Sequence, residues 1–163
     1  MAAVVRTLIY LTLIVGLILI LLPGDALEGT GLTRTSPPGI LQVAGGLIAV
    51  VGAGLALWCA FTFAIIGRGT PLPLDPPRRL VVAGPYRFVR NPMAIGVGLA
   101  LVGVAAVYES STLLGFSGLF MLGIHTFVVL YEEPTLRRMF GAEYEAYCAE
   151  VDRWLPGRPS SQS

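Results

Sequence analysis

Apolar runs long enough to cross a lipid bilayer take up most of this chain and leave little room for any other domain. They cover residues 4–22, 40–66, 93–107 and 113–131. About 20 apolar residues in a helix span a hydrocarbon core of roughly 30 Å. Charged residues make up only 13% of the chain, whereas soluble domains are about a quarter charged. We therefore expect one all-α integral membrane domain, a bundle of about four transmembrane helices over residues 1–163.

The arginines predict how these helices are oriented. The chain has no lysine, and its arginines gather in the segment 67–92 and after residue 131, with Arg34 alone between the first two runs. Because basic residues favour cytoplasmic loops, both termini should lie on the cytoplasmic side of the membrane. The membrane itself is expected to be the cytoplasmic (inner) membrane. A cleaved signal peptide is the alternative for residues 1–26. The net charge of +1 argues against a nucleic-acid partner.

The third run is short, so the polar residues before it should lie at membrane depth. Asn91 can cap this helix and Pro92 suits its first turn, which would aim a positive helix end at the preceding loop. Such an end attracts carboxylates and phosphates. The turn 108–112 carries hydroxyl residues suited to cap the next helix, which predicts a tight hairpin of the last two runs.

Small residues recur in the second and third runs at four-residue spacing, as in Gly45, Ala49 and Ala53, or Gly96 and Ala100. This spacing predicts close helix packing. The alternative for Gly96 and Gly98 is that they let a ligand approach the backbone.

Glu132 and Glu133 end the fourth run, where adjacent carboxylates need a nearby cation. Arg90 is the candidate partner. His125 lies two turns before Glu132, so the pair should share one helix face and line one cleft. The alternative for His125 is a hydrogen bond between helices.

Apolar residues recur at helical spacing between Leu136 and Trp154, which predicts a C-terminal amphipathic helix lying at the membrane interface. Gly141 should break or bend this helix. Residues 157–163 are expected to form a disordered tail. Cys59 and Cys148 have neither metal-ligand nor disulfide spacing, so no metal site is expected.

Taken together, the motifs of residues 67–156 resemble the isoprenylcysteine carboxyl methyltransferase and phospholipid methyltransferase superfamily of integral membrane enzymes. The matching segments are Gly84-Pro85-Tyr86, Arg90-Asn91-Pro92-Met93-Ala94, Glu132-Glu133, Phe140-Gly141-Ala142-Glu143-Tyr144-Glu145-Ala146-Tyr147 and Pro156. The resemblance implies an S-adenosylmethionine-dependent methyltransferase with its cofactor-binding core in residues 67–156, after two N-terminal spanning helices in residues 1–66.

The resemblance also implies which residues hold the cofactor. They are Arg78, Arg79, Leu80, Val81, Tyr86, Arg90, Asn91, Pro92, Met93, Ala94 and Glu132. S-adenosylmethionine presents cationic groups suited to a carboxylate, a carboxylate suited to an arginine, and an adenine that needs an apolar slot. Two positions depart from the family pattern, because Asn91 replaces a histidine and Ala94 a tyrosine.

The methyl acceptor is expected to be lipophilic and embedded in the membrane, with a carboxylate, thiol or amine as its reactive group. Val128 stands where relatives carry a substrate-side arginine, which argues against prenylcysteine. An amine would need a catalytic base, for which His125 and Glu133 are the candidates. Two alternatives are an NADPH-dependent membrane reductase of the sterol-reductase type and a non-catalytic membrane protein. The sequence predicts no oligomeric state.

Overall fold

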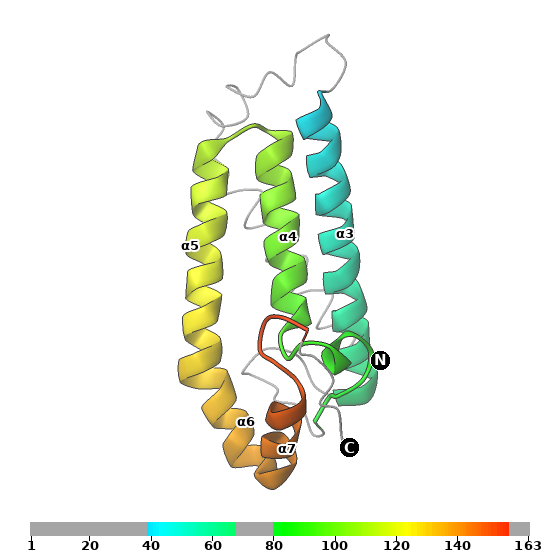
Figure 1. Ribbon diagram of the computed structural model, residues 1–163, viewed down its shortest axis with the longest axis vertical. Helices are drawn as coiled ribbons and strands as arrows, with labels where there is room; N and C mark the ends of the chain where they lie inside the picture. Colours follow the sequence, from blue (N-terminus) through cyan, green and yellow to red (C-terminus); the bar gives the residue numbers. More distant parts are fainter. Residues whose placement is uncertain (1–38, 68–79, 157–163) are drawn as a thin grey trace.

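The computed structural model describes residues 39–67 and 80–156, and all regular structure in these residues is helical. Three long helices stand side by side in Figure 1: α3 (Ile40–Thr62), α4 (Pro92–Val107) and α5 (Ser111–Phe127). Two short helices, α6 (Glu133–Phe140) and α7 (Ala142–Glu150), lie at one end of the molecule. The all-α prediction is confirmed for this part of the chain.

Three short helical turns, one 3-10 and two π, complete the regular structure of the described residues. A π turn, η1 (Phe63–Gly67), ends α3, a 3-10 turn, η2 (Gly84–Arg87), precedes α4, and a second π turn, η3 (Val128–Glu132), joins α5 to α6. The predicted first span at 4–22, the arginines Arg78 and Arg79 and the tail 157–163 lie outside the described residues.

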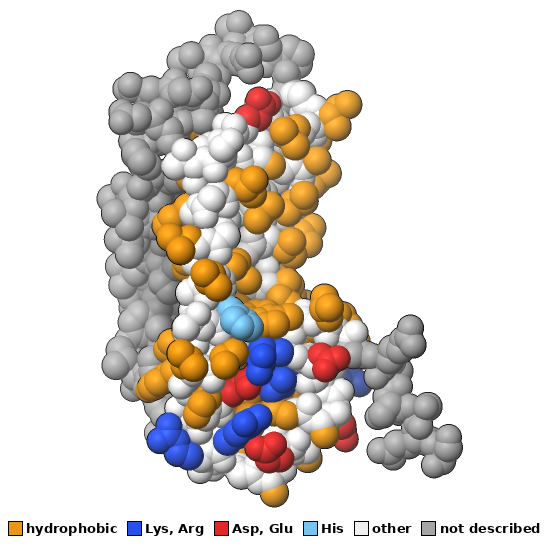
Figure 2. All heavy atoms as spheres, turned by 60° about the vertical axis from the view of Figure 1, so that its left-hand side comes forward, with side chains coloured by type: hydrophobic (Ala, Val, Ile, Leu, Met, Phe, Trp, Pro, Cys, Tyr) orange, Lys and Arg blue, Asp and Glu red, His pale blue; other side chains and the backbone are white. Residues whose placement is uncertain are grey.

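Two helical stretches are long and apolar enough to cross a membrane: Ile40–Thr62 and Ser111–Phe140. A shorter apolar helix, Pro92–Val107, stands between them. Only 17% of the apolar window in each long stretch is buried inside the molecule, the reverse of a soluble core helix and the arrangement that lipid favours. Figure 2 shows the charged side chains gathered mainly at the end that carries α6 and α7.

Glycines bring α3 and α4 into backbone contact at two levels. A Cβ on Gly45 would lie 2.8 Å from the carbonyl oxygen of Gly103, and one on Gly52 would lie 2.6 Å from that of Gly96. Real Cβ atoms do not approach that closely, so only glycine fits at this crossing. Gly96 therefore serves helix packing. Gly98 faces the Met121 side chain of α5 instead.

The hairpin of α4 and α5 forms as the sequence predicts. The Ser110 hydroxyl accepts a hydrogen bond from the amide of Leu113 at 3.3 Å and so caps α5. Pro92 occupies the first turn of α4, as expected. Asn91 occupies the N-cap position of α4 as predicted, but its side chain makes no capping bond, because its amide donates to the carbonyl of Arg153 at 3.3 Å.

The π turn η3 shifts the helix register just before the two glutamates. The amide of Glu133 donates to the carbonyl of Val128, five residues earlier, in place of the four-residue step of an α-helix. The wider turn adds one residue, so Glu133 falls in line with His125 and Glu132 lies about a quarter turn away. This corrects the expected common face of His125 and Glu132.

The C-terminal part folds back onto the end of the bundle. Gly141, at a φ of 51°, separates α6 from α7 as predicted. Tyr144, Tyr147 and Val151 form a small buried core under Leu80 and Phe140. The apolar side of α7 is therefore covered by protein, and the chain then returns past α7 to the start of α4 (Figure 1).

Candidate functional site

A buried glutamate held by two arginines forms the centre of the charged end. Glu133 is only 5% exposed. Arg153 donates to both of its carboxylate oxygens, from Nε at 2.6 Å and from Nη2 at 2.9 Å. Arg90 adds a second contact, with its Nη1 3.2 Å from Oε1. The expected arginine–glutamate pairing at this end therefore exists, but it involves Glu133.

Arg90 is nearly buried, and its contacts leave one buried donor atom without a partner in the described part of the chain. Its side chain is 12% exposed, its Nη1 lies 2.8 Å from the Cys148 sulfur, and its amide donates to the carbonyl of Asp152 at 2.9 Å. The buried Nε of Arg90 has no hydrogen-bond partner among residues 39–67 and 80–156. A buried guanidinium donor without a partner is costly, so this atom favours binding an acceptor group.

Glu132 lies near the buried Tyr86. Burial, and then the neighbouring Cys59 and Glu132, raise the pKa of the Tyr86 phenol well above its usual value. Tyr86 is 7% exposed and packs with Val81 and Cys59, with Met93 at the edge of this cluster. The structure thus brings together Val81, Tyr86 and Met93 of the expected cofactor residues, with Glu132 near this cluster.

Tyr147 ties α7 to the turn that carries Tyr86. Its hydroxyl donates to the Tyr86 carbonyl oxygen at 2.7 Å. Burial is the main cause that raises the pKa of Tyr147, so the phenol stays a neutral donor at physiological pH. The hydrogen bond to Glu133 raises the pKa of Arg153, which keeps that guanidinium charged.

His125 lies on the outer surface of α5. The side chain is exposed, and its Nδ1 accepts a hydrogen bond from the indole Nε1 of Trp154 at 3.1 Å. The two rings are 5.8 Å apart. His125 is thus hydrogen-bonded, but not to another helix as the alternative expected, because Trp154 lies beyond the end of α7 and directly follows Arg153.

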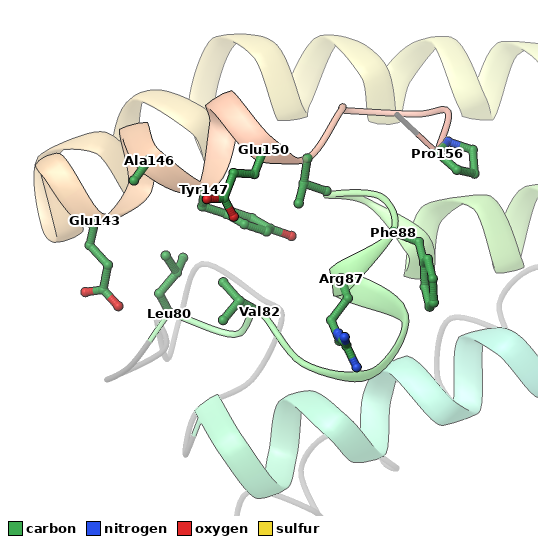
Figure 3. A pocket seen from close by; sticks show the side chains of 10 residues that line it. Leu80, Val82, Arg87, Phe88, Glu143, Ala146, Tyr147, Glu150 and Pro156 are labelled. Atoms are coloured by element: carbon green, nitrogen blue, oxygen red, sulfur yellow. The ribbon is translucent and has the colours of Figure 1, made fainter. Parts of the chain in front are cut away.

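A cavity of about 660 Å³ opens between α7 and the segment before α4 (Figure 3). Tyr147 and Ala146 line it from α7, Leu80 and Val82 line it from the segment before α4, and Arg87, Phe88, Glu143, Glu150, Val151 and Pro156 complete the lining. Cavities of this size hold small organic molecules. Of the expected cofactor residues, Leu80 lines this cavity; Pro92 is fully buried and Ala94 half-buried in α4.

Sequence reasoning missed the role of residues 147–154. It placed Arg153 only among the arginines after residue 131 and Trp154 only on an amphipathic face, while Tyr147 stood on that face and in the family motif. A signal was present, because two adjacent glutamates at a membrane boundary need more than one cation. Arg153 lies 20 residues from Glu133 in the chain but contacts it in the fold. No local sequence pattern identifies Arg153 as this partner.

Outward-facing apolar helices that end in a buried arginine–glutamate cluster define a membrane protein with a polar site at one end of its helices. A family model described as phospholipid methyltransferase matches residues 40–143, more than half of the chain. The chain belongs to this family, and it is a membrane methyltransferase by that membership. Searches among curated proteins and among solved structures each returned no match.

Proposed function

We propose that this protein transfers a methyl group from S-adenosylmethionine to a lipophilic acceptor that enters from the bilayer. The buried Nε of Arg90 is the observation that carries the proposal. It offers a charged donor at the end of the molecule where Tyr86 and Glu132 also lie. Guanidinium groups bind carboxylates strongly, and S-adenosylmethionine carries one carboxylate beside its amine.

The residues present fit the other parts of S-adenosylmethionine. Glu132 is a half-buried carboxylate suited to the ammonium and sulfonium charges. Leu80, Val82 and Tyr147 offer the adenine an apolar slot. Val81, Tyr86, Asn91, Met93 and Ala94 are proposed to lie around the cofactor, as are Arg78 and Arg79. Pro92 is fully buried and is proposed to act only by starting α4.

S-adenosylmethionine supplies a methyl carbon already activated by its sulfonium, so the protein chiefly aligns the two reactants and excludes water. Both carboxylate oxygens of Glu133 accept from Arg153, and one also contacts Arg90. A carboxylate bound in this way takes up a proton weakly, so Glu133 is a poor base and instead holds Arg90 in place. We therefore assign Glu133 a positioning role in place of the expected catalytic one.

His125 is equally unsuited to act as a base while Trp154 is bound. A neutral imidazole has one donor and one acceptor nitrogen. Its Nδ1 accepts from Trp154, so its proton sits on Nε2. An amine acceptor would then pass its proton to Glu132 or to water, whereas a carboxylate or thiolate acceptor needs no base.

Access from the bilayer is supported by the residues next to Glu132. Leu130 is 72% exposed and Tyr131 47% exposed, so apolar side chains of the π turn η3 point outward. A lipid tail could lie against them while its reactive group reaches Glu132.

Isothermal titration of the purified protein with S-adenosylmethionine tests the proposal. We expect the wild type to bind this cofactor and not NADPH, and Glu132→Gln to bind it about tenfold more weakly because one charge-assisted contact is lost. Glu145→Gln is the matched control, since Glu145 is an exposed glutamate paired with Arg137. Binding of NADPH alone would identify a reductase, and binding of neither would favour a non-catalytic role.

Transfer of labelled methyl groups to a membrane lipid extract tests the reaction itself. Labelled lipid should appear with wild type and with Glu145→Gln, and fall strongly with Glu132→Gln. Label recovered only in water-soluble products would contradict the lipophilic acceptor.

A further inference from the structure

Residues 151–154, here called the C-terminal strap, cross the open end of the α4–α5 hairpin. The opposite end of this hairpin is closed covalently by the turn at Glu109 and Ser110. Halfway along, the two helices meet where Met121 packs on Gly98. At the site end, the strap bonds to residues at the ends of both helices.

On the α4 side, the strap makes two hydrogen bonds. The amide of Arg90 donates to the carbonyl of Asp152 at 2.9 Å, and the side-chain amide of Asn91 donates to the carbonyl of Arg153 at 3.3 Å. Both donors belong to the residues just before Pro92. The strap thereby fixes where α4 begins.

On the α5 side, the strap makes side-chain contacts. Arg153 donates twice to Glu133, and Trp154 donates to His125. The π turn between His125 and Glu133 puts both acceptors on one line, which lets two consecutive strap residues reach them. The strap therefore bridges the two segments that carry Arg90 and Glu132.

We propose that Arg153 is a positioning residue that sets the distance between Arg90 and Glu132 and so determines affinity for the methyl donor. This inference rests on the proposed function. Arg153 contacts both carboxylate oxygens of Glu133. Arg90 therefore contacts Glu133 through one nitrogen, Nη1.

Without Arg153, Arg90 is the remaining cation within contact distance of Glu133 among the described residues. The guanidinium would turn fully toward Glu133 and withdraw its Nε from a ligand. Repulsion between the adjacent Glu132 and Glu133 would rise at the same time, because one compensating charge is gone. Both changes weaken the binding of a zwitterionic donor.

Titration of four variants with S-adenosylmethionine tests this inference: Arg153→Gln, Arg153→Lys, Glu133→Gln and the double variant Arg153→Gln/Glu133→Gln. We expect Arg153→Gln to weaken binding about tenfold. Lysine keeps the charge but loses the bidentate geometry, so it should restore about half of this loss in free energy. The double variant should bind S-adenosylmethionine at least as tightly as the single variant with the lower affinity, because Arg153 acts through Glu133. Arg138→Gln is the matched control, because Arg138 is an exposed arginine of α6 whose Nε donates to the Pro134 carbonyl.

Steady-state kinetics and fluorescence separate positioning from simple unfolding. The KM for S-adenosylmethionine should rise about tenfold in Arg153→Gln, with the KM for the lipid acceptor within about twofold of wild type. In a Trp58→Phe background, Trp154 emission reports whether the strap stays docked. If Arg153→Gln fails to fold, the comparison of Arg153→Lys with wild type decides by the same measurements.

The outcomes are distinguishable. A wild type that binds no S-adenosylmethionine overturns the proposed function. A wild type that binds it, together with Arg153→Gln and Arg153→Lys variants of unchanged affinity and KM, overturns only the role of Arg153. Losses in the single variants that add up in the double variant show that Arg153 does not act through Glu133 and also overturn the inference.

Discussion

Helix α4 meets α3 along one face and the C-terminal strap at its first residues, and the two contacts are built from opposite chemistry. Toward α3 the contact is backbone against backbone, with glycines at Gly52 and Gly96. Just before its N-terminal end, the backbone amide of Arg90 and the side-chain amide of Asn91 donate to carbonyls of the strap. The first contact depends on the absence of side chains, and the second depends on hydrogen bonds between segments far apart in the sequence.

This difference teaches how rigidity is distributed. The glycine contact tolerates no added atom, so it fixes α3 against α4 as a stable frame. The strap contact consists of directional bonds that can be removed one at a time. We expect substitutions in the frame to affect folding and substitutions near the strap to affect ligand binding.

Gly96→Ala should have the largest effect. A Cβ there would lie 2.7 Å from the backbone nitrogen of Ala56, and backbone cannot move aside cheaply, so we expect a loss of about 3 kcal/mol of stability. Gly98→Ala is the matched control, because its Cβ would meet the flexible Met121 sulfur at the same 2.7 Å. Thermal unfolding in detergent should show a large drop for Gly96→Ala alone. Equal drops would mean that the α3 contact is not the rigid frame.

Glu133→Gln should be the next largest. It leaves Arg90 and Arg153 without their shared carboxylate in a buried position, which we expect to cost about 2 kcal/mol. Glu145→Gln removes the partner of Arg137 in an exposed ion pair and should change stability by less than about 0.5 kcal/mol. Denaturant unfolding of the two variants measures the difference. Similar values would show that the site end is solvated.

Ala146→Trp should fill the cavity beside Tyr147 and weaken S-adenosylmethionine binding about tenfold, without unfolding the protein. Ala149→Trp adds the same side chain to the same helix at an exposed position outside the cavity lining. Calorimetric titration of both variants is the measurement. Unchanged affinity in Ala146→Trp would exclude the cavity as the adenine slot.

Tyr147→Phe should have the smallest effect, a loss of about 1 kcal/mol, because the buried Tyr86 carbonyl loses its hydrogen-bond donor. Tyr131→Phe, at a 47% exposed position, is the control. Thermal midpoints compared at one pH reveal the difference. A null result for Tyr147→Phe would show that water replaces the hydroxyl.

Several elements were predictable because their signals are local. The starts of α4 and α5 follow from apolar runs that begin after Pro92 and Ser110, and the break at Gly141 follows from a residue that adopts positive φ easily. The glycine contact of α3 and α4 follows from the spacing of small residues. Each of these depends on neighbours within about two helical turns.

Apolar helices with a charged end can be predicted from local sequence, because hydrophobic length and residue spacing act over short stretches. The choice of the glutamate that pairs with Arg90 needs the folded chain, because the π turn at Val128–Glu132 rotates Glu133 into that position. The fold also brings Arg153 and Trp154, which follow α6 and α7 in the chain, into contact with Glu133 and His125. Helix register and chain return depend on packing summed over the whole fold, which no short stretch of sequence encodes.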